Sequence, residues 1–337
     1  MKLLIVGPGA IGGTLAACVS RNNVEVSLLV RDVETKSRLQ KKGLQVGGVR
    51  GSFTAYPNIC TRTDLEKMAP IEGCFIATKA TQLAKATQDI LPYLHPEGFV
   101  CSLQNGITDP LLISLVGKEK AVGSVITWGA TQESLGIYHL TADGDLTLGT
   151  HSTVSSPFLE ESVEILHQAF PTKLTDQIFP LKYSKLLINS CMTSVGALSG
   201  LDLGPTLRLS VARKIFIEIV REGMALADAI HLDVPPFGGK LDYRAFLKGD
   251  GLLSEWRRHA IIRMVGFKYR RLTSSSLQSL RKGQQTEVDY LNGYLVEQGK
   301  AHGLSFPVNE KICTIIHSIE DEMLPIQKDN LYLIPLP

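Results

Sequence analysis

The sequence of 337 residues lacks an apolar run of the length, about 18 residues, that a membrane-spanning helix needs. Its first apolar segment follows Met1-Lys2 and is soon broken by glycine, so we expect a strand there rather than a secretion signal. The chain also lacks an excess of charge of either sign. A formal net charge of +2 gives no reason to expect a nucleic-acid or membrane partner.

Cysteines are few, and they form no C-x-x-C pair among the six present. Cys74 and Cys101 lie inside apolar runs, where a buried small hydrophobic residue is expected. This usage favours unpaired thiols in a reducing, cytoplasmic setting. The eight histidines show no H-x-x-x-H or similar spacing, so we expect no metal site.

The first half of the chain alternates strand-like and helix-like segments. The strand-like segments are residues 3–6, 24–30, 73–78 and 99–103, and the helix-like segments are residues 10–20 and 80–94. This alternation predicts a parallel sheet with helices on both faces. Residues 121–149 are rich in β-branched residues and turn signals, and they predict further strands, partly antiparallel.

The second half has helical apolar spacing instead. It appears in "SKLLINSCMTSVGALSG", in "SVARKIFIEIVREGMALADAI" and in residues 287–299, while "PPFGG" at residues 235–239 reads as a loop. We therefore predict an α/β domain over residues 1–176 and an all-helical domain over residues 177–337.

The segment "LLIVGPGAIGG" carries glycines spaced Gly7-x-Gly9-x-x-Gly12. The motif follows a predicted strand and opens a predicted helix, which is the context that a dinucleotide site requires. The first two glycines permit the turn and the approach of a pyrophosphate, and the third permits close packing of helix and strand. We predict a Rossmann-type, doubly wound dinucleotide-binding sheet; a plain tight turn is the alternative.

The second predicted strand ends in "LLVRD", with Arg31 at its tip and Asp32 next. An NAD site usually carries an acidic residue about 20 residues after the glycines, whereas arginine suits the 2′-phosphate of NADP. We favour NADP, although a solvated Arg31 and an NAD site using Asp32 stay open.

Two more predicted strands end in polar residues, Lys79 and Asn105. Ligands of doubly wound sheets bind beyond the carboxyl ends of the strands, so these residues and the glycines are expected at one edge. Each alone is equally well explained as an exposed helix start or a turn.

In the helical half, Lys185 and Asn189 are four residues apart on one helix face. Burial among apolar neighbours lowers a lysine pKa, which suits a proton donor near neutral pH, but a lysine whose ammonium reaches solvent explains the pattern too. Ser275 and Glu287 lie in "SSSLQSLRKGQQTEVDYLNG", where Glu287 is alternatively an ordinary acidic helix start. The basic run over residues 257–271 reads as a solvated helix face.

Together these motifs resemble the ketopantoate reductase family. The resemblance rests on "GPGAIGG" at 7–13, "TK" at 78–79, "LQNG" at 103–106, "KLLIN" at 185–189, "SSLQSLRKGQQTEVDYLNG" at 275–293 and "HGLSFPVN" at 302–309. It implies reduction of 2-dehydropantoate to (R)-pantoate with NADPH, a step toward pantothenate, in a cytoplasmic enzyme. A homodimer stays open.

The resemblance also implies roles for residues. Lys185 would be the general acid, with Glu287 binding the substrate hydroxyl and positioning Lys185. Asn189, Thr193, Ser275 and Asn105 would contact the substrate. The cofactor would be held by Gly7, Gly9, Ala10, Ile11, Gly12, Arg31, Lys79 and Asn105.

The chain departs from the family at Thr193, where members often carry a second asparagine. A threonine can donate one hydrogen bond but has no amide. The segment from about residue 230 to residue 272 is also longer than in compact members of the family it resembles. A reductase of another 2-oxo acid and a non-catalytic NADP-binding regulator are therefore the alternatives; retention of Lys185 and Glu287 counts against the regulator.

Overall fold

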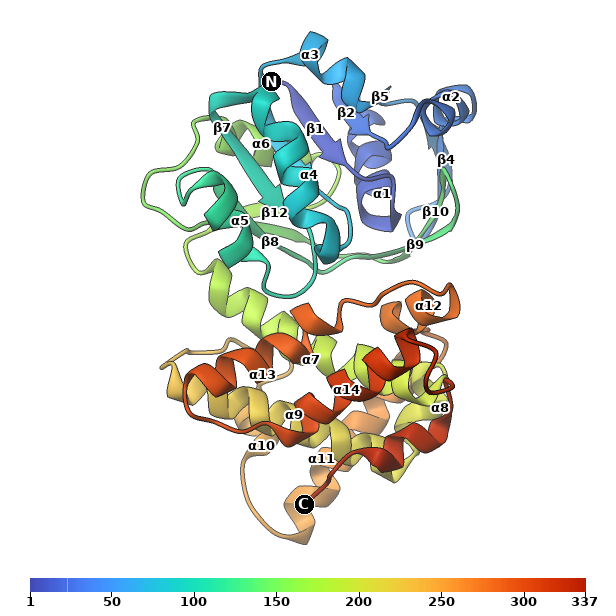
Figure 1. Ribbon diagram of the computed structural model, residues 1–337, viewed down its shortest axis with the longest axis vertical. Helices are drawn as coiled ribbons and strands as arrows, with labels where there is room; N and C mark the ends of the chain where they lie inside the picture. The colour runs from blue at the N-terminus through green and yellow to red at the C-terminus, as the bar shows by residue number, and fades with distance from the viewer. Residues whose placement is uncertain (23) are drawn as a thin grey trace. The chain divides into compact units, whose positions relative to one another are not determined.

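The computed structural model describes residues 1–22 and 24–337, which form two compact units (Figure 1). The first unit comprises residues 1–104 and 108–179. The second comprises residues 105–107 and 180–337. Residues 105–107 therefore belong to the second unit, although the residues on both sides of them in the sequence belong to the first.

The first unit is built on an eight-stranded sheet, and β1 lies in its interior. Across the sheet the strands are β12 (Thr172–Thr175), β11 (Leu146–Thr150), β8 (Ala121–Ile126), β7 (Leu94–Ser102), β6 (Ile71–Ile76), β1 (Leu3–Val6), β2 (Val26–Leu29) and β5 (Asn58–Cys60). All neighbours are parallel except β8 and β11, so the predicted parallel sheet is confirmed, as are partly antiparallel strands within residues 121–149.

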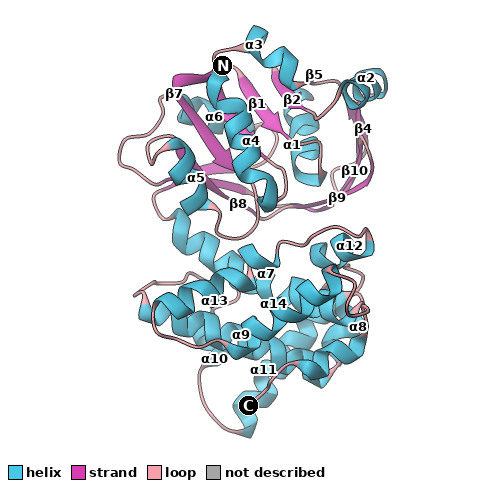
Figure 2. Ribbon diagram, in the orientation of Figure 1, coloured by secondary structure: helices cyan, strands magenta, loops and turns pink. Residues whose placement is uncertain are grey.

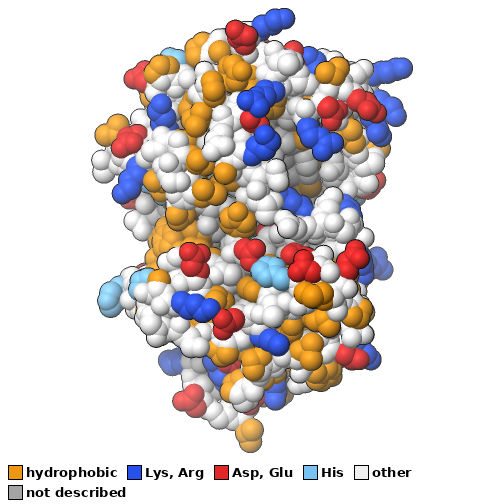
Figure 3. Space-filling model, in the orientation of Figure 1, with side chains coloured by type: hydrophobic (Ala, Val, Ile, Leu, Met, Phe, Trp, Pro, Cys, Tyr) orange, Lys and Arg blue, Asp and Glu red, His pale blue; other side chains and the backbone are white. Residues whose placement is uncertain are grey.

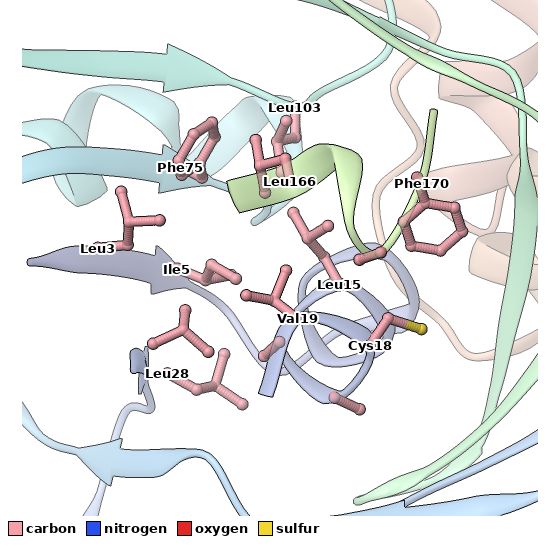
Figure 4. Close-up of a cluster of buried hydrophobic side chains, with 14 of the residues drawn as sticks. Leu3, Ile5, Leu15, Cys18, Val19, Leu28, Phe75, Leu103, Leu166 and Phe170 are labelled. Carbon is pink, nitrogen blue, oxygen red and sulfur yellow. The ribbon is translucent and has the colours of Figure 1, made fainter. Parts of the chain in front are cut away.

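Every residue of β1 is buried because helices cover both faces of the sheet. Leu3 and Ile5 point into one hydrophobic cluster, together with α1 (Ala10–Ser20) and α6 (Phe158–His167). Leu4 and Val6 point into the other, with α4 (Leu83–Ile90) and α5 (Asp109–Val116). Figure 4 shows the first cluster, where Leu15 of α1 lies among the strand side chains.

A second sheet, which the sequence did not predict, also belongs to this unit. Its strands, in order, are β4 (Phe53–Ala55), β3 (Leu44–Gly48), β10 (Ile137–Ala142) and β9 (Gly129–Ser134). It packs against α1, whose bounds match the predicted helix. The predicted helix over residues 80–94 is too long, because β7 already begins at Leu94.

The second unit is helical, as predicted (cyan in Figure 2). Its helices are α7 (Ile178–Ser199), α8 (Leu203–Arg208), α9 (Ser210–Ala229), α10 (Tyr243–Leu247), α11 (Leu252–Lys268), α12 (Ser275–Arg281), α13 (Asn292–Ala301) and α14 (Pro307–Glu320). The helix predicted over residues 287–299 is interrupted: the 3-10 turn η4 (Val288–Tyr290) precedes α13. Residues 235–239 form the predicted loop.

Charged side chains of both signs are interspersed on the face drawn in Figure 3, as the small net charge suggests. Within residues 1–22 and 24–337, none of the helices has the length and apolar character needed to cross a membrane. In the same ranges no group of three or more His, Cys, Asp or Glu side chains is arranged to hold a metal ion.

Candidate active site

The glycine-rich turn joins β1 to α1 at the carboxyl edge of the sheet. Gly7 has φ +104°, and a Cβ at Gly12 would lie 2.2 Å from the carbonyl oxygen of Gly7. Both positions therefore need glycine. A Cβ at Gly9 would meet no atom closer than 3.9 Å, so the surface above Gly9 is open beside the first N–H groups of α1, at Ala10 and Ile11. This open cradle fits a pyrophosphate.

The second sheet braces this turn. The Tyr138 hydroxyl on β10 and the Gln132 side-chain amide on β9 each donate to the carbonyl oxygen of Pro8, at 2.9 Å. A Cβ at Gly13 would lie 2.1 Å from the Tyr138 ring, so this fourth glycine admits the ring. The sequence analysis did not predict these contacts of Tyr138 and Gln132 with the turn, although the additional glycine, Gly13, was an indication of a close neighbour.

Arg31 and Asp32 follow β2 and contact each other, but the Arg31 side chain is exposed whereas the Asp32 side chain caps a helix. The Arg31 side chain is 95% exposed, with its Nε 3.4 Å from an Asp32 carboxylate oxygen. Asp32 caps α2 (Val33–Lys42) by accepting from the Thr35 N–H at 2.7 Å, and this hydrogen bond lowers the pKa of Asp32. One Asp32 oxygen is thus committed to the helix, while the Arg31 guanidinium is available to a 2′-phosphate.

Lys79 follows β6 at the same edge, next to the glycine turn. A Cβ at Gly7 would lie 3.0 Å from the Thr78 methyl group. The Gln104 amide, beyond β7, donates to the Lys79 carbonyl oxygen at 3.0 Å and lies 3.3 Å from the Thr78 hydroxyl. The ends of β1, β6 and β7 are therefore tied together where the sheet order reverses direction, which is the binding edge of such sheets.

In the helical unit, Lys185, Asn189 and Thr193 occupy successive turns of one face of α7. Each is half-buried, whereas the residues between Lys185 and Asn189 are buried. The Thr193 hydroxyl donates to the Asn189 carbonyl oxygen at 2.8 Å. In this structure the Thr193 hydroxyl thus back-bonds to its own helix, which leaves its acceptor lone pairs; contact of Thr193 with the substrate stays a prediction.

The Lys185 ammonium has an unusual electrostatic setting. The pKa of Lys185 is lowered to about 8, chiefly by burial and then by the charge of Lys182, while Glu287 acts in the opposite direction. Glu287 is half-buried at the start of η4, and its effect on the pKa places its carboxylate within electrostatic range of Lys185. A lysine with this pKa can give up a proton near neutral pH.

Asn105 belongs to the helical unit although it follows β7 in the sequence. Gly106 has φ +80°, and a Cβ there would lie 2.3 Å from the carbonyl oxygen of Tyr290. The Tyr290 N–H in turn donates to the Glu287 carbonyl oxygen at 3.1 Å. The half-buried Asn105 therefore adjoins the segment that carries Glu287.

Ser275 begins α12 and is exposed. Its neighbour Ser274 makes the structural contacts: the Ser274 hydroxyl accepts from the Leu277 N–H and lies 3.2 Å from the Thr193 carbonyl oxygen, to which it donates. A Cβ at Gly196 would lie 2.6 Å from that hydroxyl. Ser274 thus anchors α12 to α7, and Ser275 stays free of this capping role.

A buried polar chain, which sequence reasoning missed, links four helices of this unit. Ser194 donates to the Asn292 side chain at 2.5 Å, and Asn292 donates to Asn309 at 2.7 Å. Asn309 donates to the Glu222 carboxylate at 2.6 Å. The asparagines lie within the quoted motifs "YLNG" and "FPVN", which were the available signal. The chain fixes α7 relative to α9, α13 and α14.

The first unit has an open turn that fits a pyrophosphate, and the helical unit separately has a half-buried lysine with a lowered pKa; dinucleotide-dependent oxidoreductases are a class that uses both features. Comparison with known families narrows this class. Residues 3–153 match the family "Ketopantoate reductase PanE/ApbA", and residues 177–320 match its C-terminal part. The chain belongs to the ketopantoate reductase family and is an NADP-dependent oxidoreductase.

Individual relatives extend over nearly the whole chain. The 2-dehydropantoate 2-reductase of Pyrococcus abyssi is 28% identical over 92% of this chain and 94% of its own length. A ketopantoate reductase family structure from Ralstonia eutropha has a TM-score of 0.80 at 22% identity, covering 96% of this chain and 99% of its own. D-mandelate dehydrogenase, solved with NADH and anilino(oxo)acetate, has a TM-score of 0.81 at 23% identity with the same coverage.

Proposed function

We propose that this protein reduces 2-dehydropantoate to (R)-pantoate with NADPH. The observation that carries the proposal is the half-buried Lys185 on the same face of α7 as Asn189, with a pKa lowered by burial, in a chain of the ketopantoate reductase family. The six unpaired thiols fit a reaction in the reducing cytoplasm.

The first unit supplies the cofactor site in this proposal. Gly7, Gly9 and Gly12 open the cradle for the pyrophosphate, Arg31 contacts the 2′-phosphate, and Lys79 contributes a second positive charge. When bound, NADPH supplies the hydride that reduces the substrate carbonyl carbon. Asp32 caps α2 with one carboxylate oxygen, and in this proposal it is not the ribose ligand.

The helical unit supplies the proton and the substrate contacts. Lys185 holds a proton on Nζ and delivers it to the carbonyl oxygen of the substrate, where negative charge develops during reduction. Glu287 accepts a hydrogen bond from the substrate hydroxyl and favours the protonated form of Lys185. Asn189, Asn105 and Ser275 bind the remaining polar groups, including the carboxylate.

A second candidate is the reduction of a different 2-oxo acid. Two observations favour it: Thr193 has no hydrogen left to donate, and D-mandelate dehydrogenase shares the fold. A substrate with fewer polar groups than 2-dehydropantoate would need no donor from Thr193.

NADPH oxidation by the purified protein, with 2-dehydropantoate and with a panel of alkyl and aryl 2-oxo acids, separates these candidates. We expect the highest kcat/KM with 2-dehydropantoate. A panel member that is turned over better would establish the second candidate. NADPH binding without turnover of any substrate would leave a regulator and refute both reductase proposals.

Lys185→Ala tests the mechanism itself. We expect kcat to fall by about 100- to 10,000-fold, the usual contribution of a general acid, with NADPH affinity nearly unchanged. An equal fall in cofactor affinity would contradict the role as proton donor.

A further inference from the structure

Two side chains of the second sheet reach the glycine turn from neighbouring strands. Tyr138 on β10 and Gln132 on β9 are directly opposite each other in the antiparallel pair, so their side chains lie on one face of the sheet. That face packs against α1 (Figure 1). Both side chains donate to the same atom, the carbonyl oxygen of Pro8, each at 2.9 Å. A backbone carbonyl oxygen has two lone pairs, so the two donors saturate it.

The Tyr138 ring lies over the first turn of α1. Tyr138 is 1% exposed, and a Cβ at Gly13 would lie 2.1 Å from its Cζ atom and 2.2 Å from its hydroxyl oxygen. The hydroxyl therefore reaches Pro8 only because residue 13 has no side chain. Burial raises the pKa of Tyr138, so the hydroxyl keeps the hydrogen that it donates.

The two hydrogen bonds fix the plane of the Pro8–Gly9 peptide. This peptide bond is trans, and in a planar trans peptide the C=O and the N–H point in opposite directions. Because the Pro8 carbonyl oxygen points toward the second sheet, the Gly9 N–H points away from that sheet. Within residues 1–22 and 24–337, the Gly9 N–H has no hydrogen-bond acceptor. It is therefore available to a ligand.

The start of α1 has no side-chain cap of its own. Gly9 is the N-cap residue, and no acidic residue lies in the first turn. The hydrogen bond from the Gly13 N–H to the Gly9 carbonyl oxygen, at 2.8 Å, begins the helical pattern. The N–H groups of Ala10 and Ile11 precede this bond, so the helix itself leaves them unsatisfied. An anion is attracted to such N–H groups, and a carbonyl oxygen turned toward it would repel it.

We propose that Tyr138 and Gln132 are positioning residues for the pyrophosphate of the dinucleotide. By holding the Pro8 carbonyl oxygen against the second sheet, they keep the Gly9 N–H and the start of α1 open to the anion. Without the two donors, the Pro8–Gly9 peptide can rotate and turn its oxygen toward the phosphates. Both side chains act through the backbone of the turn. This inference rests on the proposed cofactor site at the glycine turn.

Tyr138→Phe removes the hydroxyl and keeps the ring, so it tests one of the two donors. Titration calorimetry of the full-length protein with NADPH should give a Kd about 2- to 10-fold above that of the wild type, the effect of one lost hydrogen bond. Tyr138→Phe/Gln132→Leu leaves the Pro8 carbonyl oxygen without either side-chain donor. Its Kd for NADPH should rise by more than about tenfold.

Tyr243 provides the matched control. It is also 1% exposed, and its hydroxyl donates to a backbone carbonyl oxygen of the helical unit, that of Ser184, at 2.5 Å. Tyr243→Phe should lower the thermal stability about as much as Tyr138→Phe does, while its Kd for NADPH stays at the wild-type value. An unchanged Kd in Tyr138→Phe/Gln132→Leu, or an equal rise in Tyr243→Phe, would overturn the proposal.

A fragment of the cofactor separates positioning of the pyrophosphate from a general loosening of the first unit. The nucleotide 2′-AMP carries the 2′-phosphate but no pyrophosphate. Tyr138→Phe/Gln132→Leu should therefore bind 2′-AMP as tightly as the wild type does, although it binds NADPH more weakly. Equal losses of affinity for NADPH and for 2′-AMP would assign the effect to the fold and refute the positioning role.

Gly9→Ala distinguishes failure of this inference from failure of the proposed cofactor site. If Gly9→Ala weakens NADPH binding and Tyr138→Phe/Gln132→Leu does not, the cofactor site stands and the positioning role is wrong. If neither variant weakens NADPH binding, the glycine turn is not the cofactor site and both proposals are wrong. These titrations contain no 2-oxo acid, so their outcome is independent of which substrate the protein reduces.

Discussion

The hydroxyl of Thr193 donates its hydrogen to the backbone carbonyl oxygen of Asn189, one turn earlier in α7. The side chain that departs from the family pattern therefore bonds to its own helix in this structure. Thr193→Val keeps the shape and removes only the hydroxyl. We expect kcat/KM for the preferred 2-oxo acid to stay within about twofold of wild type, the low end of a hydrogen-bond effect.

Asn189→Ala is the comparison for that variant, because it removes an amide from the same helix face. Its kcat/KM should fall by about tenfold, since a bound polar group then loses its partner. If steady-state assays gave Thr193→Val an equal loss, the hydroxyl would have to turn toward the substrate during catalysis.

The pKa of Lys185 predicts the pH profile of the reaction. In the proposed mechanism the Lys185 ammonium donates the proton, and its pKa is about 8, so kcat/KM for reduction should fall as the pH rises through about 8. Glu287 raises the pKa of Lys185, so Glu287→Gln should move this limb of the profile to lower pH. If the pH profile of Glu287→Gln, measured over the same range, falls at the same pH as that of the wild type, Glu287 has no electrostatic effect on Lys185.

Arg31 should determine the preference for NADPH. Arg31→Ala removes charge-assisted hydrogen bonds to the 2′-phosphate, and the KM for NADPH should rise by about 10- to 100-fold while the KM for NADH hardly changes. Arg38 is another exposed arginine, on α2, and Arg38→Ala is the control. Equal effects of the two substitutions would mean that only general positive charge matters.

An added methyl group should have different effects at two glycines of this segment: it should lower stability at Gly13 and cofactor affinity at Gly9. Gly13→Ala forces a Cβ into the Tyr138 ring and should lower the free energy of unfolding by about 1–3 kcal/mol. Gly9→Ala has room in the free protein, so its thermal unfolding should match the wild type while its NADPH affinity falls. Calorimetry measures the change in stability, and titration with NADPH measures the change in affinity. A loss of thermal stability in Gly9→Ala would contradict the open space above Gly9.

The sequence was informative where local pattern determines structure. Strand β1, the glycine turn and α1 follow one another directly, and the helix bounds came out as predicted. The second sheet could not be found in this way. Its central pair joins β3 to β10, which are far apart in the chain, and short strands of this kind carry little periodicity.

Within the site, spacing predicted that Lys185 and Asn189 share a face of α7, but it could not predict how hydrogen bonds are used. The back-bond of Thr193 and the capping role of Ser274 beside Ser275 depend on rotamers and on neighbouring helices. The interpretation of the basic run over residues 257–271 as a solvated helix face is wrong at Arg258, which is buried, because the face that α11 turns to solvent depends on where α8 and α9 lie.

Residues 105–107 belong to the helical unit although they lie within the sequence of the first unit. The sequence suggested a single junction near residue 176, yet these three residues pack with the helical unit, where Gly106 abuts Tyr290. Recombination between relatives at one crossover point would thus bring in Gly106 from one parent and Tyr290 from another. Exchange of the two units between relatives would keep this contact intact only if residues 105–107 travelled with the helical unit.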